Sequence, residues 1–94
     1  MFSIAVNDTG TVVLTGRFDA AQTDRAREVF TLLHNSTIVD MQQLDYISSA
    51  GLGLLLATQQ RLAKEGKSIT LIHMNNMIRE VFKIARFDLI FKIE

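Results

Sequence analysis

Cysteine, proline and tryptophan are all absent from this sequence of 94 residues. Without cysteine, the chain can form no disulfide, bind no metal through a thiolate and use no thiol as a nucleophile. The absence of cysteine fits a reducing compartment, and we expect the protein to be cytoplasmic.

An excess of charge and a long hydrophobic run are lacking as well. Ten basic and ten acidic residues give a formal net charge of zero, which argues against non-specific nucleic-acid binding because that binding needs a basic surface. The longest weakly polar run, residues 50–57, covers about eight residues, far fewer than the ~20 that cross a bilayer. The first residues, MFSIAVND, show no basic segment followed by a long apolar one. We therefore expect neither a signal peptide nor direct membrane insertion.

Size and composition fit one soluble domain. The length is close to the commonest domain size, and the contents of 48% hydrophobic and 21% charged residues are ordinary for a globular protein. We therefore expect a single domain over residues 1–94 with one hydrophobic core. The sequence leaves the oligomeric state open.

The first third of the chain predicts a β-hairpin followed by a helix. Residues 2–6 alternate, residues 8–10 (Asp-Thr-Gly) are a turn signal, and residues 12–16 form the second strand. Asp19 is the expected N-cap of the next helix, with Gln22 as its reciprocal partner. Four apolar residues of that helix follow core spacing: Ala26, Val29, Phe30 and Leu33.

The middle of the chain predicts a strand and a long helix. Residues 37–41 are apolar around Asp40 and are typical of a short buried strand. The helix starts near Ser49 and lasts to about Lys64, where Gly66 supplies the stop signal.

The last third predicts a strand, a helix and a final short strand. Residues 68–73 alternate and are rich in β-branched side chains. Asn75 is the expected N-cap of a third helix, and residues 88–93 form the closing strand. The inward stripe of that helix is Ile78, Val81, Phe82 and Ala85. The order β-β-α-β-α-β-α-β predicts an α/β fold, in which about three helices cover a mixed sheet of about four to five strands.

The stretch DYISSAGLGLLL, residues 45–56, places two serines at the start of the second helix. A serine there is among the commonest N-caps, and a cap contributes about 1 kcal/mol without any further function. A phosphoserine at the same place would carry about −1.5 to −2 charges where the helix dipole favours negative charge. Local chemistry leaves both interpretations open for Ser48 and Ser49.

Glycine and leucine in the same stretch point to a contact surface. Gly51 and Gly53 each cost roughly 0.8–1 kcal/mol against alanine inside a helix, so something must require them. Leu54 and Ala57 fall off the core stripe of the helix and are expected to face outward, near the serines.

Three segments together resemble the STAS domain family, and most closely the bacterial anti-sigma factor antagonists. They are LTGRFDAAQ at residues 14–22, IVDMQQLDYISSAGLGLLL at residues 38–56 and MNNMIREVFKIARFDLIFKI at residues 74–93. The middle segment is the most specific of the three. Relatives commonly carry glycine where Arg86 stands.

The resemblance implies a regulatory binding module of the anti-anti-sigma type. In that family a serine at the position of Ser49 is phosphorylated by a partner that is both serine kinase and anti-sigma factor. The unphosphorylated domain binds this partner, phosphorylation ends binding, and a phosphatase restores it. The partner-binding residues implied here are Ser48, Ser49, Gly51, Gly53 and Leu54. The alternative is a STAS subunit that docks, without phosphorylation, on a membrane lipid-transport ATPase complex.

Two carboxylates complete the predicted site. Asp19 and Asp40 match acidic or amide positions near the serine in relatives. A buried carboxylate needs hydrogen-bond donors, and the amides of the loop before the helix could supply them to Asp40. Both residues are therefore expected to organise the loop that carries Ser49.

Other chemistry finds little support in the sequence. His34 and His73 are far apart and lack metal-ligand spacing, and no GxSxG or P-loop motif is present. Met74, Met77 and Ile84 border the stripe of the third helix and are interpreted as the edge of the core. We expect no enzyme activity, no metal and no cofactor.

Overall fold

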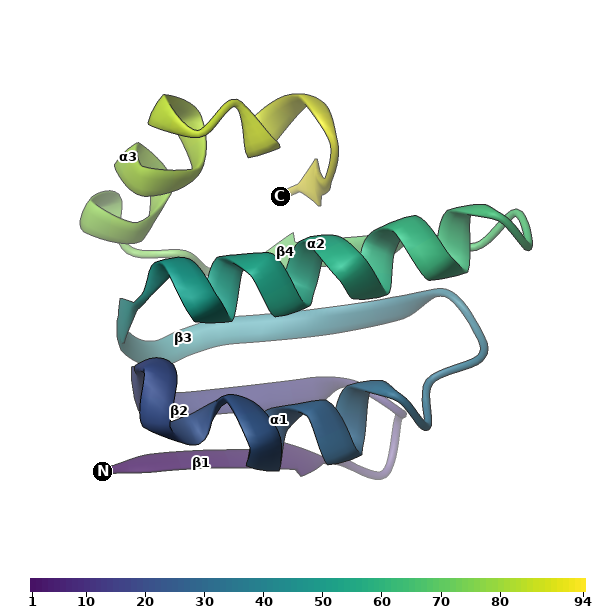
Figure 1. Ribbon diagram of the computed structural model, residues 1–94, viewed down its shortest axis with the longest axis horizontal. Helices are drawn as coiled ribbons and strands as arrows, with labels where there is room; N and C mark the ends of the chain where they lie inside the picture. Colours follow the sequence, from purple (N-terminus) through teal and green to yellow (C-terminus); the bar gives the residue numbers. More distant parts are fainter.

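Three helices cover one face of a five-stranded sheet with the strand order β1-β2-β3-β4-β5 (Figure 1). The computed structural model describes residues 1–94. The strands are β1 (Phe2–Val6), β2 (Val12–Phe18), β3 (Thr37–Ile47), β4 (Ile69–Ile72) and β5 (Lys92–Ile93), and the helices are α1 (Thr23–Phe30), α2 (Ser49–Ala63) and α3 (Asn76–Ile84). Two short 3-10 helices, η1 (Ala20–Gln22) and η2 (Phe87–Leu89), complete the chain. The predicted fold class and element order are confirmed.

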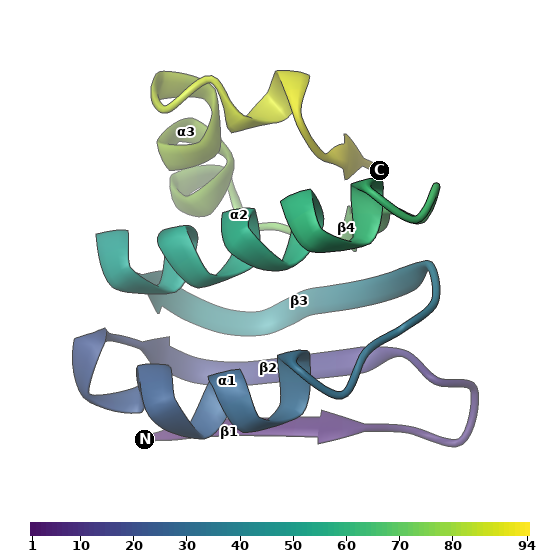
Figure 2. The same cartoon turned by 45° about the vertical axis from the view of Figure 1, so that its right-hand side comes forward.

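The connections between parallel strands explain why the helices share one face. β1 is antiparallel to β2, whereas β2, β3, β4 and β5 are each parallel to the next strand. Adjacent parallel strands joined by right-handed crossovers place every connecting helix on the same side, as the two views show (Figures 1 and 2). The carboxyl ends of β2, β3 and β4 consequently meet at one edge of the sheet, where η1, α2 and α3 begin.

The core lies between the sheet and the helices, and it confirms most of the predicted stripes. Ala26 and Phe30 of α1 are fully buried. In α3, Phe82 is fully buried and Ile78 is 1% exposed. Val29, Leu33 and Val81 are partly buried. Ala85 is exposed, contrary to the prediction, because α3 ends at Ile84 and the chain turns away there.

β3 is much longer than the predicted strand, which ended at residue 41. The buried side chains Val39, Met41, Leu44 and Ile47 are spaced by two and then by three residues. Two register shifts against β2 insert extra residues into β3, and these bulges break the strict alternation. The segment that leads to α2 is therefore strand rather than loop.

The capping box predicted for Asp19 and Gln22 is half right. The Asp19 side chain accepts a hydrogen bond from the backbone N–H of Ala21 at 3.2 Å, so it caps η1. The Gln22 side chain makes no capping hydrogen bond, and α1 itself begins one residue later. Because the short 3-10 helix lies between Asp19 and α1, the two residues do not have the reciprocal geometry that a capping box needs.

Arg86 follows α3 in the left-handed conformation, with φ of 63°. This conformation explains why glycine is favoured there, since a residue with a Cβ pays about 1–2 kcal/mol in it. We expect Arg86→Gly to raise the free energy of unfolding by about 1 kcal/mol in urea denaturation, part of the gain being offset by the freer unfolded chain. The control is Lys83→Gly inside α3, which should lose about 1 kcal/mol. A destabilised Arg86→Gly variant would contradict this account.

Candidate functional site

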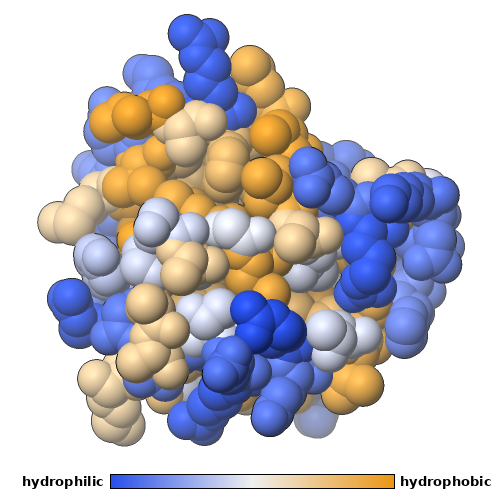
Figure 3. Space-filling model, viewed as in Figure 1, coloured by the Kyte–Doolittle hydropathy of each residue, from blue (hydrophilic) through white to orange (hydrophobic).

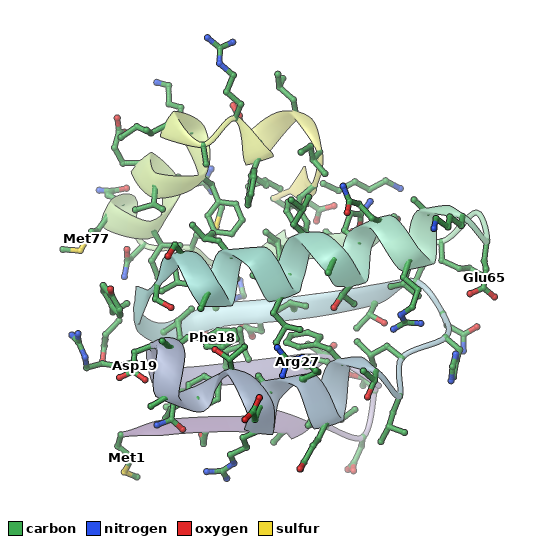
Figure 4. The ribbon with its side chains drawn as sticks, in the orientation of Figure 1. Met1, Phe18, Asp19, Arg27, Glu65 and Met77 are labelled. Atoms are coloured by element: carbon green, nitrogen blue, oxygen red, sulfur yellow. The ribbon has the colours of Figure 1, made fainter.

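The serine pair lies where the chain passes from β3 into α2, at the carboxyl edge of the sheet. The backbone N–H of Ser48 donates to the carbonyl oxygen of Phe18 at 2.9 Å, which ties this loop to the end of β2. In Figure 4 the start of α2 lies between Asp19 on one side and Met77 on the other. Three segments distant in sequence thus meet around the serines.

The structure gives the two serines different roles. Ser48 is the N-cap of α2, and its Oγ accepts a hydrogen bond from the backbone N–H of Gly51 at 3.2 Å. Ser49 is the first residue of the helix, is exposed, and its hydroxyl makes no hydrogen bond within the chain. The structural interpretation therefore applies to Ser48, whereas the hydroxyl of Ser49 is open to solvent and to a partner.

We expect Ser48→Ala and Ser49→Ala to differ in stability. Loss of the Ser48 cap should lower the free energy of unfolding by about 1 kcal/mol, because the amide of Gly51 loses its acceptor. Ser49→Ala should change it by less than about 0.5 kcal/mol, as is usual for an exposed position. Urea denaturation of the two single variants beside the parent protein measures both values. A larger loss in Ser49→Ala than in Ser48→Ala would reverse the assigned roles.

The packing of the fold explains Gly51. A Cβ at Gly51 would lie 2.9 Å from Cγ1 of Ile47 and 3.2 Å from ring atoms of Phe18, which is fully buried. This glycine lets α2 pack closely on the ends of β2 and β3. Its predicted place in the partner surface is therefore wrong, since it is buried.

Gly53 has no such explanation. It is exposed, and a Cβ built there would meet no atom within 4 Å. The fold alone would be more stable with alanine at this position. Gly53 lies four residues after Ser49, so the two residues share one face of α2.

The prediction that Leu54 faces outward is wrong. Leu54 is only 9% exposed and belongs to the hydrophobic core. It lies on the side of α2 that faces α1, where it lines a hollow with Arg27, Thr31 and Arg61. Because α2 packs on both the sheet and α1, more of its circumference is buried than the spacing of its core residues predicts. Ala57, by contrast, is exposed as predicted.

Asp19 and Asp40 prove to have different surroundings. Asp19 immediately follows Phe18, whose carbonyl holds the amide of Ser48, so it lies in the loop next to the serines. Asp40 lies in β3, seven residues before Ile47, which corresponds to roughly 20 Å along the strand. The predicted role of Asp40 in the serine loop is therefore wrong.

The contacts of Asp40 show what it does instead. Its Oδ1 accepts from the backbone N–H of Gln42 at 3.0 Å and lies 3.1 Å from Nδ1 of His73. Gln42 lies within the first register shift of β3, where an amide needs an acceptor outside the regular ladder. Asp40 thus supports the bulge on the face of the sheet that carries no helix.

Hydrophobic side chains that remain accessible on α2 and α3 were missed in the sequence. Met77, in the first turn of α3, is 67% exposed, and Ile84 on the same flank of the helix is 76% exposed. Leu56 of α2 is half-buried. Figure 3 shows hydrophobic surface gathered over α3 and η2 and along α2. The interpretation as core edge is therefore wrong for Met77 and Ile84, whereas Met74 is buried in the core as expected. The seven-residue spacing of these two residues is the sequence signal for one apolar flank.

Comparison with known proteins identifies the fold family. The model of the family described as "Mlab, STAS domain" matches residues 4–92, nearly the whole chain. The chain belongs to the STAS domain family. The resemblance carried by the segment around Ser49 is thereby confirmed at the level of the family.

Two curated relatives resemble this STAS domain in sequence. A STAS-domain containing protein of Pseudomonas aeruginosa (strain UCBPP-PA14) is 27% identical over 86 residues, which cover 88% of this chain and 85% of the relative. BtrV of Bordetella bronchiseptica, described as a candidate anti-sigma factor antagonist, is 34% identical over 74 residues. That match covers 79% of this chain but only 58% of BtrV.

The solved structures show the same fold. The unphosphorylated form of the anti-sigma factor antagonist SpoIIAA has a TM-score of 0.75 at 19% identity and covers 100% of this chain and 87% of its own. The phosphorylated form of the Bacillus cell fate determinant SpoIIAA has a TM-score of 0.72, again at 19% identity, with coverages of 100% and 91%. Both structures therefore share the fold of this STAS domain.

Neither a cluster of metal ligands nor a membrane-spanning helix is found in this STAS domain. No group of three or more His, Asp or Glu side chains is placed to hold a metal ion. Among the helices, none combines the length and the apolar character needed to span a bilayer.

Proposed function

We propose that this STAS domain is an anti-sigma factor antagonist whose binding is switched by phosphorylation of Ser49. The observation that carries the proposal is the position of the Ser49 side chain. Its hydroxyl is exposed, makes no hydrogen bond within the chain, and stands in the first turn of α2. A protein kinase can reach such a hydroxyl without unfolding any element.

A phosphate on Ser49 would be tolerated by the fold. The first amides of a helix have no acceptor inside the helix, and the dipole makes this end positive. Ser48 already satisfies the amide of Gly51, and the backbone amides of Ser49 and Ala50 remain free of partners in the chain. The added charge would therefore change the surface and leave the core intact, as a reversible switch requires.

The proposed partner surface is the outer face of α2 together with the start of α3. It comprises Ser49, Gly53, Leu56 and Met77. Gly53 lets a partner backbone approach closely, while Leu56 on α2 and Met77 at the start of α3 offer apolar area. Ser48 lies next to this surface but does not offer its side-chain oxygen to a partner, because that oxygen caps α2. A negative charge added at Ser49 would have to be desolvated by the partner and would oppose binding.

The relatives support this choice of partner class. BtrV is described as a candidate anti-sigma factor antagonist, and SpoIIAA is such an antagonist with phosphorylated and unphosphorylated forms. By this proposal the partner is an anti-sigma factor that is also the serine kinase, and a phosphatase reverses the modification. The domain acts in the cytoplasm by binding, without enzyme activity and without a cofactor.

Affinity purification with three baits tests the proposed function. The parent protein and Ser49→Ala should both capture the anti-sigma kinase from a lysate of the native host, whereas Ser49→Asp should capture much less. Mass spectrometry identifies the captured proteins. Equal capture of lipid-transport ATPase subunits by all three baits, with no anti-sigma factor, would contradict the proposal and favour constitutive docking in a transport complex.

A further inference from the structure

The β1 edge of the sheet is open and lies away from the proposed partner surface. β1 is the first strand in the sheet order and pairs only with β2. In both ribbon views α1 lies in front of β1 and β2, and no element lies beyond β1 (Figures 1 and 2).

The backbone hydrogen bonds between β1 and β2 show which groups of β1 point outward. The carbonyl oxygen of Met1 accepts from the amide of Arg17, and the amide of Asn7 donates to the carbonyl oxygen of Thr11. Since alternate residues of a strand bond to opposite sides, Met1, Ser3, Ala5 and Asn7 bond to β2. The N–H and C=O groups of Phe2, Ile4 and Val6 therefore face the free edge.

Apolar side chains accompany these free groups. Ile4 is half-buried, Val6 is 51% exposed, and Leu32 just after α1 is 75% exposed. Val6 and Leu32 line the same surface hollow at the end of β1. An added strand would thus meet both unpaired backbone groups and uncovered apolar surface.

Natural proteins protect such edges by charge, proline, bulges or shortness. The opposite edge of this sheet is protected, because β5 has only two residues and one of them is the exposed Lys92. The β1 edge has none of these devices. Residues 1–7 carry no charged side chain, the chain has no proline, and the register of β1 with β2 is uninterrupted.

We infer that the β1 edge binds the β1 edge of a second copy, forming a two-fold dimer with a continuous sheet. Antiparallel pairing centred on Ile4 uses all five residues of the strand and aligns every outward group with its counterpart. It sets Ile4 against Ile4 of the second copy and Phe2 against Val6. An uncharged strand offers no counter-charge to an acidic or basic partner, whereas it meets its own copy without like-charge repulsion.

The size of this contact predicts a weak dimer. A contact made by a five-residue strand and the side chain of Leu32 is small beside the ~1,000 Å² that a stable interface buries, so we expect a dimer that forms only at high protein concentration. The interface leaves Ser49 and α2 free and does not depend on the proposed function.

Light scattering after gel filtration, from about 10 μM to about 1 mM protein, tests the inference. The mass of the parent protein should rise toward that of a dimer. Val6→Lys should remain a monomer, whereas the control Leu89→Lys, which adds the same charge at the 78% exposed Leu89 of η2, should still dimerise. A parent protein that stays monomeric throughout, or a dimer that Leu89→Lys abolishes and Val6→Lys preserves, would overturn the proposal.

Cysteine cross-linking tests the register and does not rely on the lysine variant being folded. Because the chain has no cysteine, a single Ile4→Cys residue can form a disulfide only with a second copy. It should cross-link readily under mild oxidation, since paired Cα atoms lie about 5.5 Å apart. Val6→Cys should cross-link poorly because it faces Phe2. Cross-linking of Val6→Cys in preference to Ile4→Cys would overturn the assigned pairing.

Discussion

Ser49→Asp is expected to weaken binding of the anti-sigma partner by about 100-fold, or about 2.7 kcal/mol. The carboxylate would be placed in the middle of the surface made by Ser49, Gly53, Leu56 and Met77, where a partner would have to desolvate it. Calorimetric titration of the purified partner with each variant measures the change.

Two variants make this result interpretable. Ser49→Ala removes the hydroxyl without adding charge, and it should bind the partner within a few-fold of the parent protein. Asn35→Asp adds the same charge at an exposed loop before β3, at the other end of the sheet, and should leave the affinity unchanged. If Ser49→Asp binds as tightly as Asn35→Asp, the surface around Ser49 is not the binding site.

Gly51→Val is expected to lower the free energy of unfolding by about 2–3 kcal/mol. Even the first carbon of a side chain would lie 2.9 Å from Ile47 and 3.2 Å from the ring of Phe18. Phe18 is fully buried and Ile47 is only 5% exposed, so neither can move without opening the core. Urea denaturation monitored by circular dichroism provides the measurement.

Gly53→Ala is the matched control, and its stability should change with the opposite sign. It should raise the free energy of unfolding by roughly 0.8–1 kcal/mol, because alanine favours the helix and nothing lies within 4 Å of the new methyl group. The same variant should bind the partner more weakly if the partner backbone approaches Gly53. Destabilisation by Gly53→Ala, or a neutral Gly51→Val, would contradict the roles assigned to the two glycines.

The framework of the fold could be predicted from the sequence because its signals are local. Asn75 is the N-cap of α3, and its Oδ1 accepts from the amide of Ile78 at 2.8 Å. Gly66 follows α2 with φ of 73°, as expected of a helix stop. The exposed position of Ser49 at the start of α2 follows from the same kind of signal. Such short-range patterns are sufficient for element order and helix boundaries.

The errors arise where tertiary contacts overrule local spacing. Leu54 is off the core stripe of α2, yet it is buried because α1 covers that flank. The strand predicted around Asp40 ended at residue 41, but bulges carry β3 on to Ile47 and leave Asp40 far from the serines. Gly51 and Gly53 look alike in sequence. Only the packing of Phe18 and Ile47 separates the structural glycine from the one that the fold does not need.

Phosphorylation by the partner kinase tests the central claim most directly. The purified parent protein, Ser48→Ala and Ser49→Ala are each incubated with the kinase and ATP, and phosphopeptides are mapped by mass spectrometry. The account predicts one phosphate, on Ser49, in the parent protein and in Ser48→Ala, and none in Ser49→Ala. Phosphate on Ser48, or an unmodified parent protein beside an active kinase, would contradict it.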